Sequence, residues 1–179
     1  MGCTATCAYI ENDTLAIAHV GDSRAYLLHE GTLIRVTRDH SYVEELVDAG
    51  EITADEARVH PNRSVITRAL GSDPAMYADH FTLHIEEGDR LILCSDGLSS
   101  MIPDSDIENI ATQSSTAQIC VDNLVDAALA AGGHDNVTVV VVDLVDDGVM
   151  REAQRVRRRN ITIAAILAPV SYTHLRAHE

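Results

Sequence analysis

The chain has 179 residues, of which 46% are hydrophobic, enough for one domain with a buried core. Its formal net charge of −15 argues against nucleic acid as a partner, because phosphate backbones favour clustered Lys and Arg. The cysteines form no Cys-x-x-Cys pair and the histidines form no His-x-His or His-Glu-x-x-His motif, which disfavours a disulfide framework and a zinc site.

Four strand-like segments occupy the first part of the chain. Residues 3–11, 14–20, 24–30 and 32–37 are rich in apolar and β-branched side chains, and turn signals separate them. The connections are short, so we expect an antiparallel meander.

Helical patterns begin after residue 39. Residues 41–50 place their apolar side chains on one helical face, and Gly50 ends the segment. Thr53, followed three residues later by Glu56, predicts a capping box at the start of a second, short helix. Pro61 lies just beyond that helix and breaks it.

The second half of the chain returns to strands and adds two helices. Strands are expected at residues 78–85, 90–95 and 137–145, and helices at 103–111 and 116–131. The last strand is strongly β-branched and apolar on both faces, which is typical of a strand between two layers.

The end of the chain has a different composition. We expect a basic linker at residues 148–160, an apolar stretch at 161–170 and a non-native tail at 171–179. The apolar run is too short to span a bilayer, but the arginines before it resemble the cytosolic flank of a membrane helix. One hypothesis is therefore a truncated membrane helix beginning near Ile161, and the alternative is a basic tail or surface helix.

Three aspartates stand at the ends of predicted strands. Asp22 and Asp96 each follow an apolar strand, and Asp135 precedes one, so an antiparallel arrangement could bring all three to one rim. Gly21 and Gly97 flank them and allow sharp backbone exits. Clustered carboxylates repel one another and suit Mg²⁺ or Mn²⁺, whereas a single Asp at such a position is more often a turn or cap residue.

Six local strings resemble the ordered motifs of bacterial type 2C protein serine/threonine phosphatases. They are MGCTA, AHVGDSRAYLL, TRDHS, VITRALG, LILCSDGL and HDNVTVVVV, and they extend from residue 1 to about 145. The resemblance implies an α+β fold, an antiparallel β-sandwich flanked by helices in α-β-β-α layers. It places a partial catalytic domain at residues 1–147, with a flap beside the active site at about 39–70.

The same resemblance implies a function and a site. Family members hydrolyse phosphoserine and phosphothreonine in proteins with a metal-activated water, using two Mn²⁺ or Mg²⁺ ions and in some cases a third. By motif position, Asp96 and Asp135 would ligate the core metal, with Asn136 in support. Asp22 would lie at the third, more loosely held ion together with Asp96.

The chain departs from the family pattern at its start. The opening family segment, with a phosphate-binding Arg and an Asp-Gly-Met-Gly-Gly loop, is not found, so we expect the fold to be incomplete and this chain alone to be inactive. Two other readings are a non-catalytic, phosphatase-like regulatory module and an acidic β-rich domain that binds Ca²⁺ or only stays soluble.

Partners follow from the family resemblance. It implies phosphoprotein substrates, among them a Ser/Thr kinase and its targets. Separately from the resemblance, we expect a cytoplasmic location, with a tether on the cytosolic face of a membrane if the apolar stretch inserts.

Overall fold

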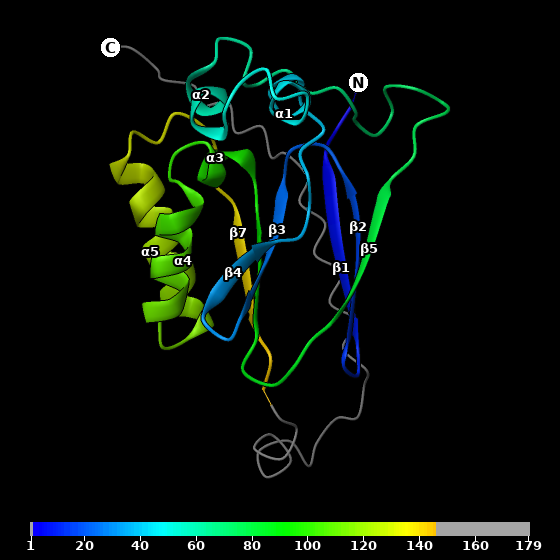
Figure 1. Ribbon diagram of the computed structural model, residues 1–179. Coiled ribbons are helices and arrows are strands. Elements are labelled where there is room, and N and C mark those ends of the chain that lie inside the picture. Colours follow the sequence, from blue (N-terminus) through cyan, green and yellow to red (C-terminus); the bar gives the residue numbers. More distant parts are fainter. Residues whose placement is uncertain (1, 146–179) are drawn as a thin grey trace, which may run out of the picture.

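The computed structural model describes residues 2–145, which form two stacked antiparallel sheets with helices against one of them (Figure 1). The expected fold class, an antiparallel β-sandwich with flanking helices, is confirmed. One sheet has the order β1-β2-β5, with strands β1 (Ala5–Glu11), β2 (Thr14–Val20) and β5 (Asp79–His84). The other has the order β4-β3-β6-β7, with strands β3 (Arg24–His29), β4 (Thr32–Arg35), β6 (Arg90–Cys94) and β7 (Val139–Asp143).

The expected meander is wrong at the junction between β2 and β3. β2 pairs with β1 and β5, whereas β3 pairs with β4 and β6, so the chain crosses from one sheet to the other at residues 21–23. Turn residues mark where a strand ends, but they do not say which sheet the next strand joins. That choice depends on the apolar faces that the distant strands β5 and β6 offer.

Alternating side chains of the four-stranded sheet face two different cores. Ala25 and Leu27 of β3 face the other sheet, while Tyr26 and Leu28 face the helices. All five residues of β6 are buried, which explains why it is apolar from Leu91 to Cys94.

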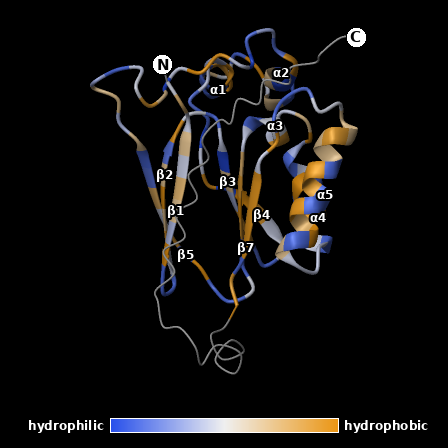
Figure 2. Ribbon diagram, turned by 180° about the vertical axis from the view of Figure 1, so that it is seen from behind, coloured by the Kyte–Doolittle hydropathy of each residue, from blue (hydrophilic) through white to orange (hydrophobic). Residues whose placement is uncertain are grey.

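Two helices cover the outer face of the four-stranded sheet. They are α4 (Asp104–Gln113) and α5 (Ala117–Ala130), and each carries an apolar stripe beside a polar one (Figure 2). Their apolar stripes, which include Ile107 and Leu124, pack against Ile92. Of the expected α-β-β-α layers, residues 2–145 therefore contain the two sheets and the helices on one side.

The predicted flap covers one end of the sandwich (Figure 1). It contains α1 (Tyr42–Asp48) and α2 (Ala54–Val59), and the predicted capping box of α2 is present, with Thr53 and Glu56 bonded reciprocally. An isolated bridge between Ser41 and Ile66 joins the two ends of this excursion. A four-residue helix, α3 (Asp96–Ser99), was not predicted, because it is too short to show a period.

The expectations for the basic linker, the apolar stretch and the final tail lie outside the described residues. Within residues 2–145, no helix combines the length and the apolar character that crossing a bilayer requires.

Candidate metal centre

The three predicted aspartates line one cleft of ≈ 450 Å³ beneath the flap. Strand register explains why they meet. Arg24 at the start of β3 lies opposite Cys94 at the end of β6, and β7 begins beside that same end. Asp22, Asp96 and Asp135 lie just outside these strand ends, so the sheet delivers all three to one rim.

Gly97 and Asn136 bring two of the loops into close contact. A Cβ atom on Gly97 would lie 2.3 Å from the carbonyl oxygen of Asn136, so only glycine allows this approach. Ser95 Oγ donates to that same oxygen at 3.1 Å and accepts from Thr138 N at 3.0 Å. The loops that carry Asp96 and Asp135 are therefore held together by close backbone packing and by the Ser95 side chain.

Gly21 has a similar role beside Asp22. Its φ of +114° lies in a region that other residues rarely adopt, and a Cβ atom there would lie 2.3 Å from Thr4 Cγ2. Gly21, Gly97 and Asn136, predicted as supporting residues, thus shape the backbone at the rim.

The carboxylates at the rim perturb one another. Burial, and then the negative charges of Asp96 and Asp39, raise the pKa of Asp22 to about 6. Burial, and then the charge of Asp135, raise the pKa of Asp96 as well. Within the described residues, neither Asp22 nor Asp96 forms an ion pair with a cationic side chain.

A hard divalent cation would relieve this repulsion. Carboxylate oxygens are the ligands that Mg²⁺ and Mn²⁺ prefer, so the side chains present fit such an ion. No group of three or more His, Cys, Asp or Glu side chains within residues 2–145 is arranged to hold a metal ion by itself. The aspartates therefore suit a partial ligand set, not a closed one.

An ionic network beside the aspartates was missed in the sequence. Arg24 donates to both oxygens of Asp39, with Nε–Oδ1 at 2.9 Å and Nη2–Oδ2 at 2.7 Å. Arg35 Nη2 forms ion pairs with Asp39 Oδ1 at 2.8 Å and with Glu44 Oε1 of α1 at 3.2 Å. The network ties the flap to β3 and β4. Only the sequence proximity of Arg24 to Asp22 could have pointed to it.

The far wall of the cleft belongs to the flap and to the segment after α3. Apolar side chains there include Val43, Val47 and Met101, and Arg58 lies among them. Arg58 Nη1 donates to the carbonyl oxygen of Ile102 at 3.3 Å, which connects α2 to the rim. The cleft is therefore lined by apolar and cationic side chains as well as by carboxylates.

Comparison with known proteins identifies relatives of this chain. The sequence profile of the Protein phosphatase 2C family matches residues 1–137. The serine/threonine phosphatase stp of Listeria welshimeri is 39% identical over 143 residues, which cover 80% of this chain and 57% of that protein.

Solved structures agree with that match. The serine/threonine phosphatase PstP/Ppp of Mycobacterium tuberculosis superimposes with a TM-score of 0.77 at 42% identity, covering 82% of this chain and 61% of that chain. A structure of the PstP catalytic domain in complex with two manganese ions gives a TM-score of 0.73 at 40% identity, covering 82% of this chain and 60% of that one. The chain thus spans between half and two thirds of these relatives, and it belongs to the protein phosphatase 2C family.

Proposed function

We propose that the cleft is part of the active site of a metal-dependent protein serine/threonine phosphatase. In this proposal Asp96 and Asp135 ligate the core metal, and Asp22 shares a more loosely held ion with Asp96. The observation that carries it is the convergence of the three aspartates in one cleft, two of them with raised pKa values. Membership of the family supports the reaction class.

The residues of this chain hold and shape the site. Mn²⁺ or Mg²⁺, when bound, would supply a nucleophilic water near neutral pH and neutralise charge on the phosphoryl group. Asp22, Asp96 and Asp135 provide the oxygens that bind the ions. Flap residues line the cleft, and in this proposal the flap shapes the access of the phosphorylated side chain.

A protein nucleophile is not needed for this chemistry. Cys94 lies at the end of β6, close to the rim, but its side chain is fully buried. Burial raises the pKa of its thiol to about 12, so Cys94 is not a thiolate at neutral pH. This supports attack by water over attack by a cysteine.

The proposed substrates are proteins that carry phosphoserine or phosphothreonine, among them a Ser/Thr kinase and its targets. Matched phosphothreonine and phosphotyrosine peptides test the substrate class. If a protein that joins this chain to the family's opening segment turned over the phosphotyrosine peptide faster, the substrate class would be contradicted.

The metal site is tested by Mn²⁺ binding to the 179-residue chain. Thermal unfolding should shift upward with Mn²⁺, because a ligand that binds only the folded state stabilises it, and Asp96→Asn should abolish the shift. Asp106→Asn, on the exposed surface of α4, is the matched control and should retain it. Equal shifts in all three proteins would contradict the site.

Turnover requires more ligands than the described residues supply. We therefore expect no detectable hydrolysis of a phosphothreonine peptide by this chain alone with Mn²⁺. Clear turnover that disappears in Asp96→Asn would show that the described ligands suffice.

We also propose a cytosolic location with a membrane tether at residues 161–170. The support is the basic composition of residues 151–159 directly before that apolar run. Co-sedimentation with anionic vesicles should be lost when the chain ends at residue 147. Equal binding by both chains would contradict the tether.

A further inference from the structure

His40 holds the backbone of the residue that precedes Asp22. The Gly21 N–H donates to His40 Nδ1 at 3.0 Å, and the His40 N–H donates to the Gly21 carbonyl oxygen at 2.7 Å. Both polar backbone groups of Gly21 are thus bonded to one residue. Because Gly21 has an unusual φ of +114° and lies against Thr4, this pairing selects the direction in which the chain enters Asp22.

The bond from Gly21 also decides the tautomer of His40. A backbone N–H can only donate, so Nδ1 carries no proton and a neutral ring must carry its proton on Nε2. Nε2 lies 3.1 Å from Asp79 Oδ2 and donates to it, so the 3.0 Å contact between Nε2 and Arg68 Nη1 joins two donors that share Asp79 as their acceptor. Arg68 Nη1 donates to the other oxygen, Oδ1, at 2.6 Å. His40, Asp79 and Arg68 thus form an ordered chain of hydrogen bonds that begins at the rim.

Surrounding groups keep the ring in this place. The His40 side chain is only 7% exposed, and its ring centroid lies 4.9 Å from that of the buried His19. His19 is fixed in turn, with Nδ1 2.9 Å from Thr6 Oγ1 and Nε2 3.0 Å from the Arg38 carbonyl oxygen. Burial alone would raise the pKa of Asp79, but the hydrogen bonds from His40 and Arg68 outweigh it and lower that pKa, so Asp79 stays an anionic acceptor.

His40 also lies where the two ends of the flap meet. Its carbonyl oxygen accepts from Thr67 N at 2.9 Å, and the next residue, Ser41, bridges to Ile66. Arg68, which holds Asp79, directly follows this returning segment. The residue that clamps Gly21 is therefore part of the base of the flap.

We infer that His40 is a positioning residue for Asp22: its neutral ring, oriented by Asp79 and Arg68, fixes the Gly21–Asp22 peptide so that Asp22 faces Asp96 across the cleft. The position of Asp22 then depends on a closed flap base. This inference rests on the proposed metal site, since the purpose of fixing Asp22 is to share a cation with Asp96.

Two substitutions test the roles of Nδ1 and Nε2 one at a time. In His40→Asn, the amide oxygen can occupy the place of Nδ1 and accept from Gly21 N–H, whereas the contact to Asp79 is lost. In His40→Gln, the longer side chain can reach Asp79 but offers no acceptor at the place of Nδ1. His84→Gln, at a histidine 63% exposed on β5, is the control for losing an imidazole.

The test uses the full 179-residue chain and Mn²⁺ as the probe. Amide NMR signals near Asp22 and near Asn136 are followed separately as Mn²⁺ broadens them. His40→Gln should need about fivefold more Mn²⁺ for broadening near Asp22, the loss of one hydrogen bond of positioning, with no change near Asn136. His40→Asn and His84→Gln should behave like the wild type, and Gly21 amide exchange should accelerate in His40→Gln only.

Each other outcome overturns a definite statement. Equal Mn²⁺ dependence in His40→Gln and His40→Asn, or an equal change near Asn136, would reduce His40 to a fold-stabilising residue. A wild-type chain in which Mn²⁺ broadens no signal near Asp22 or Asp96 would remove the proposed metal site itself. Thermal unfolding of both variants identifies any general loosening, which would move both sets of signals together.

Discussion

The two ends of the β-sandwich differ in whether their buried carboxylates have bonding partners. At the end away from the flap, Asp89 is only 3% exposed, yet its Oδ1 lies 2.7 Å from His29 Nδ1 and its Oδ2 accepts from Glu86 N at 2.9 Å. At the flap end, Asp22 and Asp96 are partly buried and have raised pKa values. The far end satisfies Asp89 with the chain's own groups, whereas at the flap end Asp39 has cationic partners but Asp22 and Asp96 do not.

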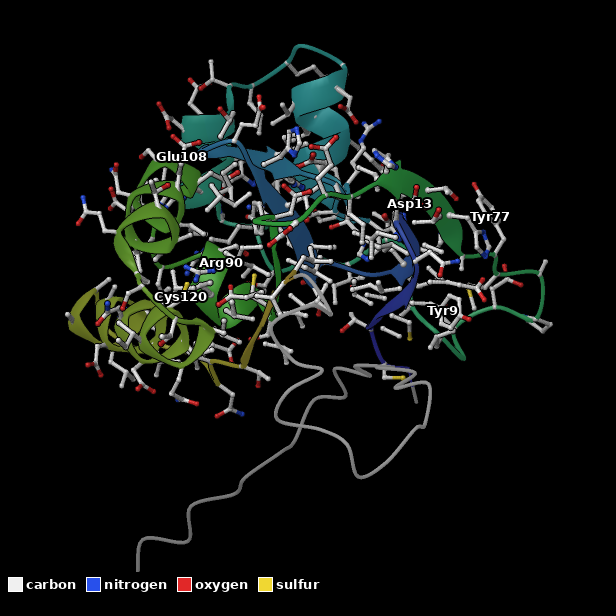
Figure 3. The ribbon with its side chains drawn as sticks, turned by 90° about the horizontal axis from the view of Figure 1, so that it is seen from below. Tyr9, Asp13, Tyr77, Arg90, Glu108 and Cys120 are labelled. Atoms are coloured by element: carbon white, nitrogen blue, oxygen red, sulfur yellow. The ribbon has the colours of Figure 1, made fainter. Side chains whose placement is uncertain are left out.

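Arg90, at the same far end, is also bonded to several groups of the chain. Its Nε donates to Asp143 Oδ1 at 2.5 Å, and its Nη1 donates to the carbonyl oxygens of Ala111 and Ser114 at 2.6 and 2.9 Å. The side chain lies beside Cys120, between the sheet and the helices (Figure 3). It therefore anchors the end of α4 to strands β6 and β7.

This contrast separates stability from function. Carboxylates with built-in partners contribute to the free energy of unfolding, whereas carboxylates that face one another reduce it until a cation binds. At the flap end, binding of a cation can thus offset the free energy that is lost when Asp22 and Asp96 are buried close together. Three tests examine this difference, beginning with the largest expected effect.

Arg90→Met should lower the free energy of unfolding by about 3 kcal/mol, because it leaves the partly buried Asp143 carboxylate and two helix-end carbonyls without a donor. Urea unfolding measures the change. Arg38→Met, at a side chain 55% exposed, is the control and should cost less than about 1 kcal/mol. A similar loss in both variants would show that burial does not determine how much these ion pairs contribute to the free energy of unfolding.

The same Asp→Asn substitution should have opposite signs at the two ends. Asp89→Asn should lower the free energy of unfolding by about 2 kcal/mol, since it weakens the bonds to His29 and Glu86. Asp22→Asn should raise it by about 1 kcal/mol in metal-free buffer, because it removes a charge that Asp96 repels. Urea unfolding with a chelator present distinguishes them, and stabilisation by Asp89→Asn would refute the contrast.

The two ends should also respond in different pH windows. The pKa of Asp22 is raised from 3.8 to about 6, so its metal-free penalty is absent below the lower value and complete above the upper one. Hydrogen bonding to Asp89 raises the pKa of His29 above 6.5, so its contribution is complete below 6.5 and is lost as pH rises through the folded value. Unfolding of Asp22→Asn and His29→Gln against the wild type should resolve these windows. If both variants differed from the wild type over the same pH range, the assignment of the two effects to Asp22 and His29 would be contradicted.

Several local features were predictable because short-range chemistry determines them. The capping box of Thr53 and Glu56 requires only residues three apart, and both the strand β6 and the helix α5 follow from their apolar patterns. The convergence of Asp22, Asp96 and Asp135 was also expected, because antiparallel neighbours share a rim. Their role as metal ligands stays a prediction.

Other features depend on which distant segments meet. The crossing from β2 to β3, the short helix α3 and the pairing of Arg24 with Asp39 have no local signal, because each requires a partner chosen by packing. His40 is the sharpest example, since nothing in its own neighbourhood predicts a bond to Gly21 or to Asp79.

The sequence by itself therefore determined the strands and the longer helices, the order of the motifs and the family, because these depend on residues close together in the chain. The tertiary structure alone decided how the strands divide between two sheets and which side chains face each other at the rim. The physical reason is that burial and electrostatic coupling act through space. The same aspartate is stabilising or destabilising according to the neighbours that the fold brings to it.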